Sequence, residues 1–110
     1  MSGSDEASRV HPEMAALRAR IDTIDAGLVD LFAERQRCIE AAAEIKTRIG
    51  WPARIPPRVD EVLDRVAARA RQDNLDPDLA RALWTALVEW SIAYEERLMK
   101  NPSDGKMDTP

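Results

Sequence analysis

The chain has 110 residues, of which 45% are hydrophobic and 33% charged, and its formal net charge at pH 7 is −4. This length fits a single small domain with a limited core, which leaves room for an obligate oligomer. The acidic balance argues against a nucleic-acid-binding protein, because such proteins usually gather a basic surplus on one face. Any anionic ligand must therefore be held by local cations.

The first and last segments of the sequence carry no apolar periodicity. Residues 1–12 and 101–110 are polar and contain Gly, Pro and Ser, which predicts disordered tails on either side of a helical domain at residues 13–100. The sequence has no signal-peptide pattern and no run of 18 uncharged apolar residues. We therefore expect a cytoplasmic protein that does not contact a membrane.

The first predicted element is a long helix over residues 13–49. It would span roughly 55 Å at the rise of an α-helix, too long to lie within one compact globule. Cys38, the single cysteine, falls within its apolar pattern, which predicts a buried and unreactive thiol. Apolar or small residues recur there at alternating steps of three and four, as in a heptad seam: Met14, Leu17, Ile21, Ile24, Leu28, Leu31, Cys38, Ala42, Ile45 and Ile49.

Two shorter helices are predicted after this one. Gly50 ends the first helix, and the proline-rich residues 51–57 form a loop. A second helix covers residues 58–73, with Asn74 closing it in a left-handed conformation. Asp76 is the predicted N-cap of a third helix, and Pro77 is its first residue; this helix runs to residue 99. Its apolar stripe contains Leu83, Trp84, Leu87, Val88, Ile92, Tyr94 and Leu98. The fold class is therefore all-α.

Polar residues interrupt these apolar surfaces. Arg35 lies on the seam itself, seven residues after Leu28 and seven before Ala42, while Arg18 and Lys46 each follow a seam residue. In the third helix, Ser91 and Glu95 replace apolar residues. Because a buried charge needs a partner of opposite sign, two interpretations are open. Arg35 could pair with Glu95 and Lys46 with another acid in a polar layer that fixes helix register, or the cations could bind an anionic ligand.

The spacing of the cations bears on this choice. Arg18 and Arg35 are 17 residues apart, about 25 Å along one helix, so they cannot hold the same small ligand from one chain. If two copies of the helix paired antiparallel, crossing near Leu28 and Val29, Arg18 of one chain would approach the Arg35 to Lys46 segment of the other. Two identical sites per dimer would result.

Residues 14–99 resemble the AroQ-type (type II) chorismate mutases and the related isochorismate pyruvate lyases. The resemblance rests on LRARIDTIDAGLVDLFAERQRCIEAAAEIK at residues 17–46, with Arg18, Arg35 and Lys46 at the family's spacing. It rests also on LDPDLARALWTALVEWSIAYEE at residues 75–96, which is similar to the family's third helix. That helix carries a polar residue and then Gln or Glu four positions later, and the matching residues here are Ser91 and Glu95. It implies an intertwined homodimer of three-helix protomers with two active sites.

The resemblance also implies the roles of the site residues. Arg35, Arg58 and Arg18 of the other protomer would hold the two carboxylates of chorismate, with Ser91 also in the binding site. Lys46 and Glu95 would donate hydrogen bonds to the ether oxygen as its bond breaks, without a cofactor, metal or nucleophile. Only a protonated Glu95 can donate, so we expect turnover to fall as pH rises, and Glu95→Gln to flatten that profile.

The sequence departs from the family pattern near the loop. Val59 follows Arg58 where many mutases carry Glu, and Ile55 stands where Asp is common; Arg54 is an alternative to Arg58 in the alignment. The chain resembles the lyases in having Val at position 59, whereas Glu at position 95 favours a mutase. Chorismate mutase is therefore the leading prediction, and an isochorismate pyruvate lyase or a mutase of an amino analogue of chorismate is the alternative.

A non-enzymatic alternative is a helical dimerisation module. Trp51, Trp84 and Trp90 are its candidate contact residues, although Trp84 falls on the apolar stripe and suits the core. Neither the pathway that an enzyme of this type would serve nor its regulation follows from the sequence.

Overall fold

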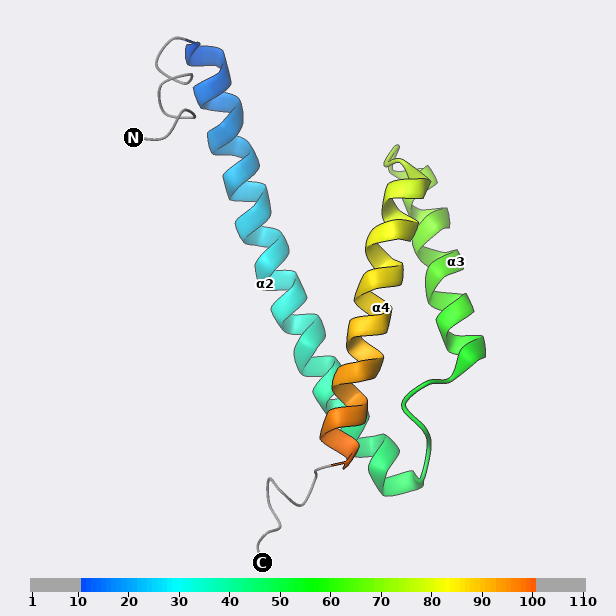
Figure 1. Cartoon of the computed structure of the whole chain (residues 1–110). Helices are drawn as coiled ribbons and strands as arrows, with labels where there is room; N and C mark the ends of the chain where they lie inside the picture. The colour runs from blue at the N-terminus through cyan, green and yellow to red at the C-terminus, as the bar shows by residue number, and fades with distance from the viewer. Residues whose placement is uncertain (1–10, 101–110) are drawn as a thin grey trace, which may run out of the picture. The chain divides into compact units, whose positions relative to one another are not determined.

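The computed structural model describes residues 11–100, which form three α-helices (Figure 1). These are α2 (Pro12–Ile49), α3 (Pro56–Gln72) and α4 (Pro77–Lys100). The described part of the chain contains no β-strand. The prediction of an all-α chain with one long N-terminal helix is confirmed. Of the tails predicted at residues 1–12 and 101–110, residues 1–10 and 101–110 lie outside the described residues, whereas Pro12 belongs to α2.

The ends of α2 follow from its flanking residues. The helix begins at Pro12, one residue before the predicted start, and the His11 carbonyl accepts hydrogen bonds from the N–H groups of Met14 and Ala15 at 2.8 and 3.1 Å. Pro suits this first position, since its missing N–H would have no partner inside the helix. Gly50 ends the helix with φ 78°, as predicted from its freedom to adopt a left-handed conformation.

The second and third helices also start with proline. Pro56 opens α3 two residues before the predicted start, because prolines fit the first turn of a helix. Asn74 has φ 58°, which confirms its predicted left-handed conformation after α3. At the start of α4, Asp76 Oδ1 accepts a hydrogen bond from the Asp78 N–H at 2.9 Å, which confirms Asp76 as the N-cap.

The chain divides into two compact units, residues up to 36 and residues from 37 onward, and each is described by itself. In the second unit, α3 and α4 pack side by side (Figure 1). Buried alanines at positions 67, 70 and 80 allow close packing of these helices. A small apolar cluster is formed by the buried residues Ala53, Val88 and Ile92, against which Val59, Val62 and Met99 pack.

The predicted apolar seam of α2 is exposed to a large extent in the single chain. Cys38 is exposed, so the prediction of a buried thiol is wrong. The same correction applies to Leu83 on α4, which is 51% exposed although it falls on the predicted stripe. A seam that is regular enough to bind another helix need not be covered by its own chain. The exposed seam residues in the first unit are Met14, Leu17, Ile21, Ile24, Leu28 and Leu31.

The three tryptophans differ in their surroundings. Trp84 is half-buried, in keeping with its place on the α4 stripe, whereas Trp51 and Trp90 are exposed. Across residues 11–100, no helix is long and apolar enough to cross a membrane.

Candidate active site

Two polar residues lie within the buried face of α4. Ser91 and Glu95 are both 4% exposed, on the same face as the buried residues Val88 and Ile92. Their spacing of four places them one turn apart, so the prediction that polar residues interrupt the apolar stripe here is confirmed. The Ser91 hydroxyl donates a hydrogen bond to the Leu87 carbonyl at 2.8 Å. The α4 core therefore carries a carboxyl group that requires a partner.

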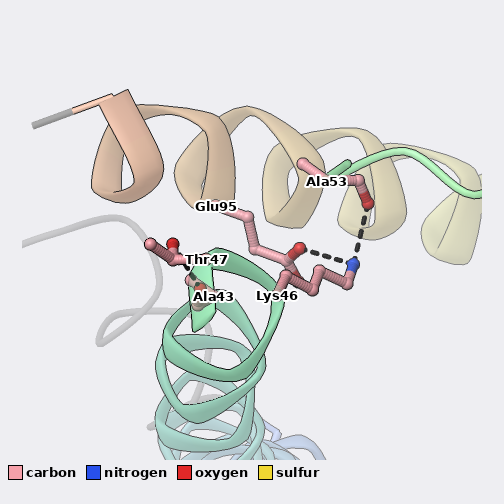
Figure 2. Close-up of polar contacts among 5 residues, drawn as sticks. All are labelled: Ala43, Lys46, Thr47, Ala53 and Glu95. Carbon is pink, nitrogen blue, oxygen red and sulfur yellow. Dashed lines mark hydrogen bonds and ion pairs between the residues drawn. The ribbon is translucent and has the colours of Figure 1, made fainter. Parts of the chain in front are cut away.

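Lys46, near the C-terminal end of α2, is a partner of Glu95. Its Nζ donates a hydrogen bond to Glu95 Oε1 at 2.7 Å and a second to the Ala53 carbonyl at 2.8 Å (Figure 2). The Lys46 side chain is 17% exposed and that of Glu95 is 5% exposed. Within the described residues, these bonds use two of the three N–H donors of the ammonium group. The ammonium is thus held by two acceptors on different segments and has one donor left for a ligand.

This arrangement suits stabilisation of negative charge. Because water is largely excluded from the pair, an ammonium group interacts more strongly with a nearby oxygen than it would at the surface. A cation already fixed in position also avoids the reorganisation that a mobile side chain would need. A ligand oxygen that becomes negative beside Lys46 would therefore be stabilised.

The loop between α2 and α3 is attached to α4 by a second ion pair. Arg54 donates two hydrogen bonds to Glu89, from Nη1 to Oε2 at 3.0 Å and from Nη2 to Oε1 at 2.6 Å. These hydrogen bonds, together with the charge of Arg54, lower the pKa of the Glu89 carboxyl, and Glu89 in turn raises the pKa of Arg54. Arg54 and Glu89 are nevertheless about half exposed.

Arg58 lies in the first turn of α3 and is exposed. Its Nη1 donates a hydrogen bond to Glu61 Oε1 at 2.8 Å, and Arg65 binds the other oxygen of Glu61 at 3.1 Å. The hydrogen bond from Arg58, followed by the charge of Arg65, lowers the pKa of the Glu61 carboxyl. Arg58 would therefore have to exchange Glu61 for any carboxylate that it bound.

A further contact between α2 and α4 was not predicted from the sequence. The Tyr94 hydroxyl donates a hydrogen bond to Glu40 Oε2 at 2.6 Å, and the ring centroids of Tyr94 and Trp90 lie 4.8 Å apart. A half-buried Tyr on an apolar stripe signals that its hydroxyl needs an acceptor. The sequence pattern did not identify Glu40 as that acceptor, because the angle between the helices decides it.

The remaining predicted site residues belong to the other unit. Arg18 and Arg35 are half-buried on the part of α2 that precedes residue 37. The structure thus brings Lys46 and Glu95 together, while the grouping of Arg18 and Arg35 with them stays a prediction. No group of three or more His, Cys, Asp or Glu side chains among residues 11–100 is placed to hold a metal ion.

Comparison with known proteins identifies the family. The profile described as "Chorismate mutase type II" matches residues 17–96, which include Lys46, Ala53, Ser91 and Glu95. The chain belongs to the type II chorismate mutase family. The resemblance predicted from the spacing of Arg18, Arg35 and Lys46 is thereby confirmed, and with it the assignment to a family of isomerases.

Three relatives of different activity are similar to this member of the chorismate mutase family. The chain is 28% identical to the chorismate mutase of Methanocaldococcus jannaschii, with 80% of this chain and 89% of the relative aligned. It is 31% identical to the 4-amino-4-deoxychorismate mutase of Streptomyces venezuelae (83% and 88% aligned). It is 30% identical to the isochorismate pyruvate lyase of Pseudomonas aeruginosa (74% and 80% aligned). By contrast, the chain spans only 22% and 25% of two longer relatives.

Proposed function

We propose that this chain is a chorismate mutase, which rearranges chorismate to prephenate by breaking a carbon–oxygen bond while a carbon–carbon bond forms within one molecule. The observation that carries the proposal is the water-shielded Lys46 ammonium, fixed between Glu95 and the Ala53 carbonyl, in a chain of this family. The reaction needs no cofactor, because nothing is transferred to or from the substrate. Catalysis then depends on conformational restriction and electrostatic stabilisation.

Lys46 and Glu95 would act on the ether oxygen. In the transition state this oxygen gains negative charge, and the third N–H of Lys46 is available to donate to it. Glu95 would add a second donor when it carries a proton, and as an anion it would hold the ammonium in place. The 2.7 Å contact between these groups supports a shared position at the ether oxygen. Ser91, one turn before Glu95 on the same buried face, would complete the binding site on the α4 side.

Arginines would bind the two carboxylates and keep the substrate folded. Guanidinium groups match carboxylates in a bidentate geometry that also fixes orientation. We assign this role to Arg35, to Arg58 and to Arg18 of the partner subunit. Arg58 is the better candidate than Arg54 because Arg58 makes one hydrogen bond to Glu61, whereas Arg54 makes two to Glu89.

An intertwined homodimer would complete each site. The first unit of α2 exposes apolar side chains at heptad spacing; Leu28, for example, is 45% exposed and Ile24 52%. Covering this stripe with the same stripe of a second copy satisfies a self-complementary twofold interface. Within one chain, Arg18 and Arg35 lie about 25 Å apart along the helix. In an antiparallel pairing, Arg18 of the partner subunit would instead approach Arg35.

A lyase acting on isochorismate, or a mutase of an amino analogue of chorismate, is the second candidate. Val59 favours it, since this half-buried side chain packs against the apolar cluster where many mutases carry Glu. Val59 cannot donate or accept a hydrogen bond with a ring substituent. The similarity to the Streptomyces and Pseudomonas relatives named above is in keeping with either variant.

Product analysis separates these activities. The purified protein is incubated with chorismate, isochorismate and 4-amino-4-deoxychorismate in turn. Prephenate from chorismate supports the proposal, the corresponding amino product supports the analogue mutase, and salicylate with pyruvate from isochorismate supports the lyase. Turnover of none of the three contradicts an enzymatic role of this kind.

Ligand protection separates any of these enzymes from a dimerisation module. A bicyclic dicarboxylate that mimics the folded transition state should raise the Tm of the enzyme, because it binds the folded state alone. An interaction module, with Trp51 and Trp90 as contacts, would show no shift. A cytoplasmic location and a role in aromatic amino acid biosynthesis through the shikimate pathway are part of the proposal.

A further inference from the structure

Two hydrogen bonds hold Lys46, and one of them comes from the loop. The Ala53 carbonyl accepts from Lys46 Nζ at 2.8 Å, a distance similar to that of the Glu95 contact (Figure 2). Glu95 lies on a regular helix, whose backbone is fixed by its own hydrogen bonds. Ala53 lies in residues 51–55, a segment outside any helix. The position of the ammonium therefore depends on what fixes the loop.

Three features attach the loop to the helices around it. The Trp51 N–H donates a hydrogen bond to the Lys46 carbonyl at 2.9 Å, which ties the start of the loop to the end of α2. Ala53 as a whole is 7% exposed and packs with Val88 and Ile92 of α4. The third feature is the Arg54–Glu89 pair, in which both donors of one guanidinium edge meet both oxygens of one carboxylate.

The ion pair has the geometry for a positioning role. Apolar packing of the small Ala53 methyl group against Val88 is non-directional, so it does not by itself fix the orientation of the Ala53 carbonyl. A bidentate guanidinium–carboxylate pair fixes both distance and orientation. Arg54 directly follows Ala53 and Glu89 directly follows Val88, so the pair holds the peptide that carries the Ala53 carbonyl against one turn of α4.

We propose that Arg54 and Glu89 are positioning residues, which lock the Ala53 carbonyl in place and thereby aim the free N–H of Lys46 at the reacting oxygen. This inference rests on the proposed function for its kinetic part. Arg54 then acts through Ala53 and Lys46, without touching the substrate. The pair is about half exposed, so its contribution to global stability is small, and its effect lies in the geometry of one donor.

Arg54→Met and Glu89→Gln test the proposal together. Met removes the guanidinium group of Arg54, and Gln replaces one carboxylate oxygen of Glu89 with an amide nitrogen that cannot accept a hydrogen bond, so each substitution breaks the bidentate pair. Each should lower kcat on the order of tenfold, less than the roughly 100-fold that a full 1 Å misplacement can cost, because the loop keeps its other attachments; KM should change less than twofold. The double variant should lose no more than either single one, because both remove the same interaction. Glu89→Arg combined with Arg54→Glu should recover part of the lost kcat.

The control is a matched ion pair away from the loop. Arg69 Nε binds Asp73 Oδ2 at 2.9 Å near the end of α3, and both side chains are exposed. Arg69→Met removes one exposed arginine, as Arg54→Met does, and should leave kcat and KM unchanged.

Three results would overturn the positioning role. The first is an unchanged kcat in both single variants. The second is a raised KM in Arg54→Met alone, which would mean that Arg54 binds substrate directly; Glu89→Gln would then leave binding intact or strengthen it. The third is a loss of activity that vanishes when rates are divided by the folded fraction of each variant.

A measurement without substrate separates this inference from the proposed function. The methyl resonance of Ala53, followed by NMR in wild-type protein and in Arg54→Met, reports the loop directly. Its shift and order parameter should change in Arg54→Met and Glu89→Gln but not in Arg69→Met. If they change while the wild-type protein turns over no substrate, the ion pair fixes the loop and the proposed function fails. If turnover is present but the methyl resonance does not move, the positioning role fails.

Discussion

Lys46 Nζ and Glu95 Oε1 lie 2.7 Å apart, with only 17% and 5% of the two side chains exposed. A water-shielded cation and carboxylate at this distance depend on one another, because removing either leaves the other without its counter-charge. The pair is also placed where two helices and a loop meet. Stability and catalysis are therefore expected to respond together when one member is changed.

Lys46→Gln should lower kcat by roughly 100- to 1000-fold, the range seen when one donor to a developing negative charge is removed. Gln is shorter and neutral, so it cannot supply the same electrostatic stabilisation. Initial rates of chorismate consumption measure the effect, and circular dichroism confirms the helical fold. The matched control is Lys100→Gln, at the exposed end of α4, which should keep full activity. A Lys46→Gln enzyme within threefold of wild type would contradict the role of Lys46.

Glu95→Gln and Glu95→Ala together test the role of Glu95 beside Lys46. The Gln side chain keeps the length of Glu and an oxygen that accepts from Lys46, and its amide N–H can donate to the ether oxygen. Ala leaves Lys46 without this acceptor, so Glu95→Ala should lower kcat much further than Glu95→Gln does. Initial rates of chorismate consumption measure both variants. Equal kcat in Glu95→Ala and the wild type would contradict the role of Glu95.

The Glu89 carboxyl should titrate below the ordinary range of a glutamate. Its hydrogen bonds from Arg54 favour the ionised form, and so does the positive charge of Arg54. Because the folded-state pKa is lowered, the ion pair stabilises the protein above the unfolded-state pKa, and this contribution is lost as pH falls through the folded value. Carboxyl NMR titration of wild type and Arg54→Met measures the shift. The pKa of Glu89 should rise toward its ordinary value in Arg54→Met, and an identical pKa in the two proteins would contradict the pairing.

The sequence predicted the helices well because local signals define their ends. Gly50, Asn74 and Asp76 act through their own backbone or side-chain chemistry, which does not depend on distant residues. The burial of Ser91 and Glu95 was predictable for a similar reason, since the period of an α-helix places them on the stripe that contains Val88 and Ile92.

Contacts between elements were harder to predict. The Arg54–Glu89 pair and the Tyr94–Glu40 hydrogen bond each join residues far apart in the sequence, and the path of the loop or the angle between helices decides them. The apolar period also predicted wrongly that Cys38 is buried. It identified a surface suited to another helix, but a period alone does not specify that this helix comes from the same chain.

Mixing two inactive variants should restore activity if each site is built from two chains. A mixed dimer contains one Arg18→Ala protomer and one Lys46→Gln protomer. If Arg18 acts across the interface, one site of this dimer carries both substitutions and the other site carries neither. Random exchange of equal amounts makes half of the dimers mixed, so activity should recover to about a quarter of the wild-type value.

The mixture is denatured and refolded together, and its rate is compared with each variant refolded alone. If Arg18 acts within its own chain, every site carries one substitution and no recovery occurs. Co-refolding each variant with wild-type protein controls for refolding yield, and size-exclusion chromatography with light scattering confirms the dimer.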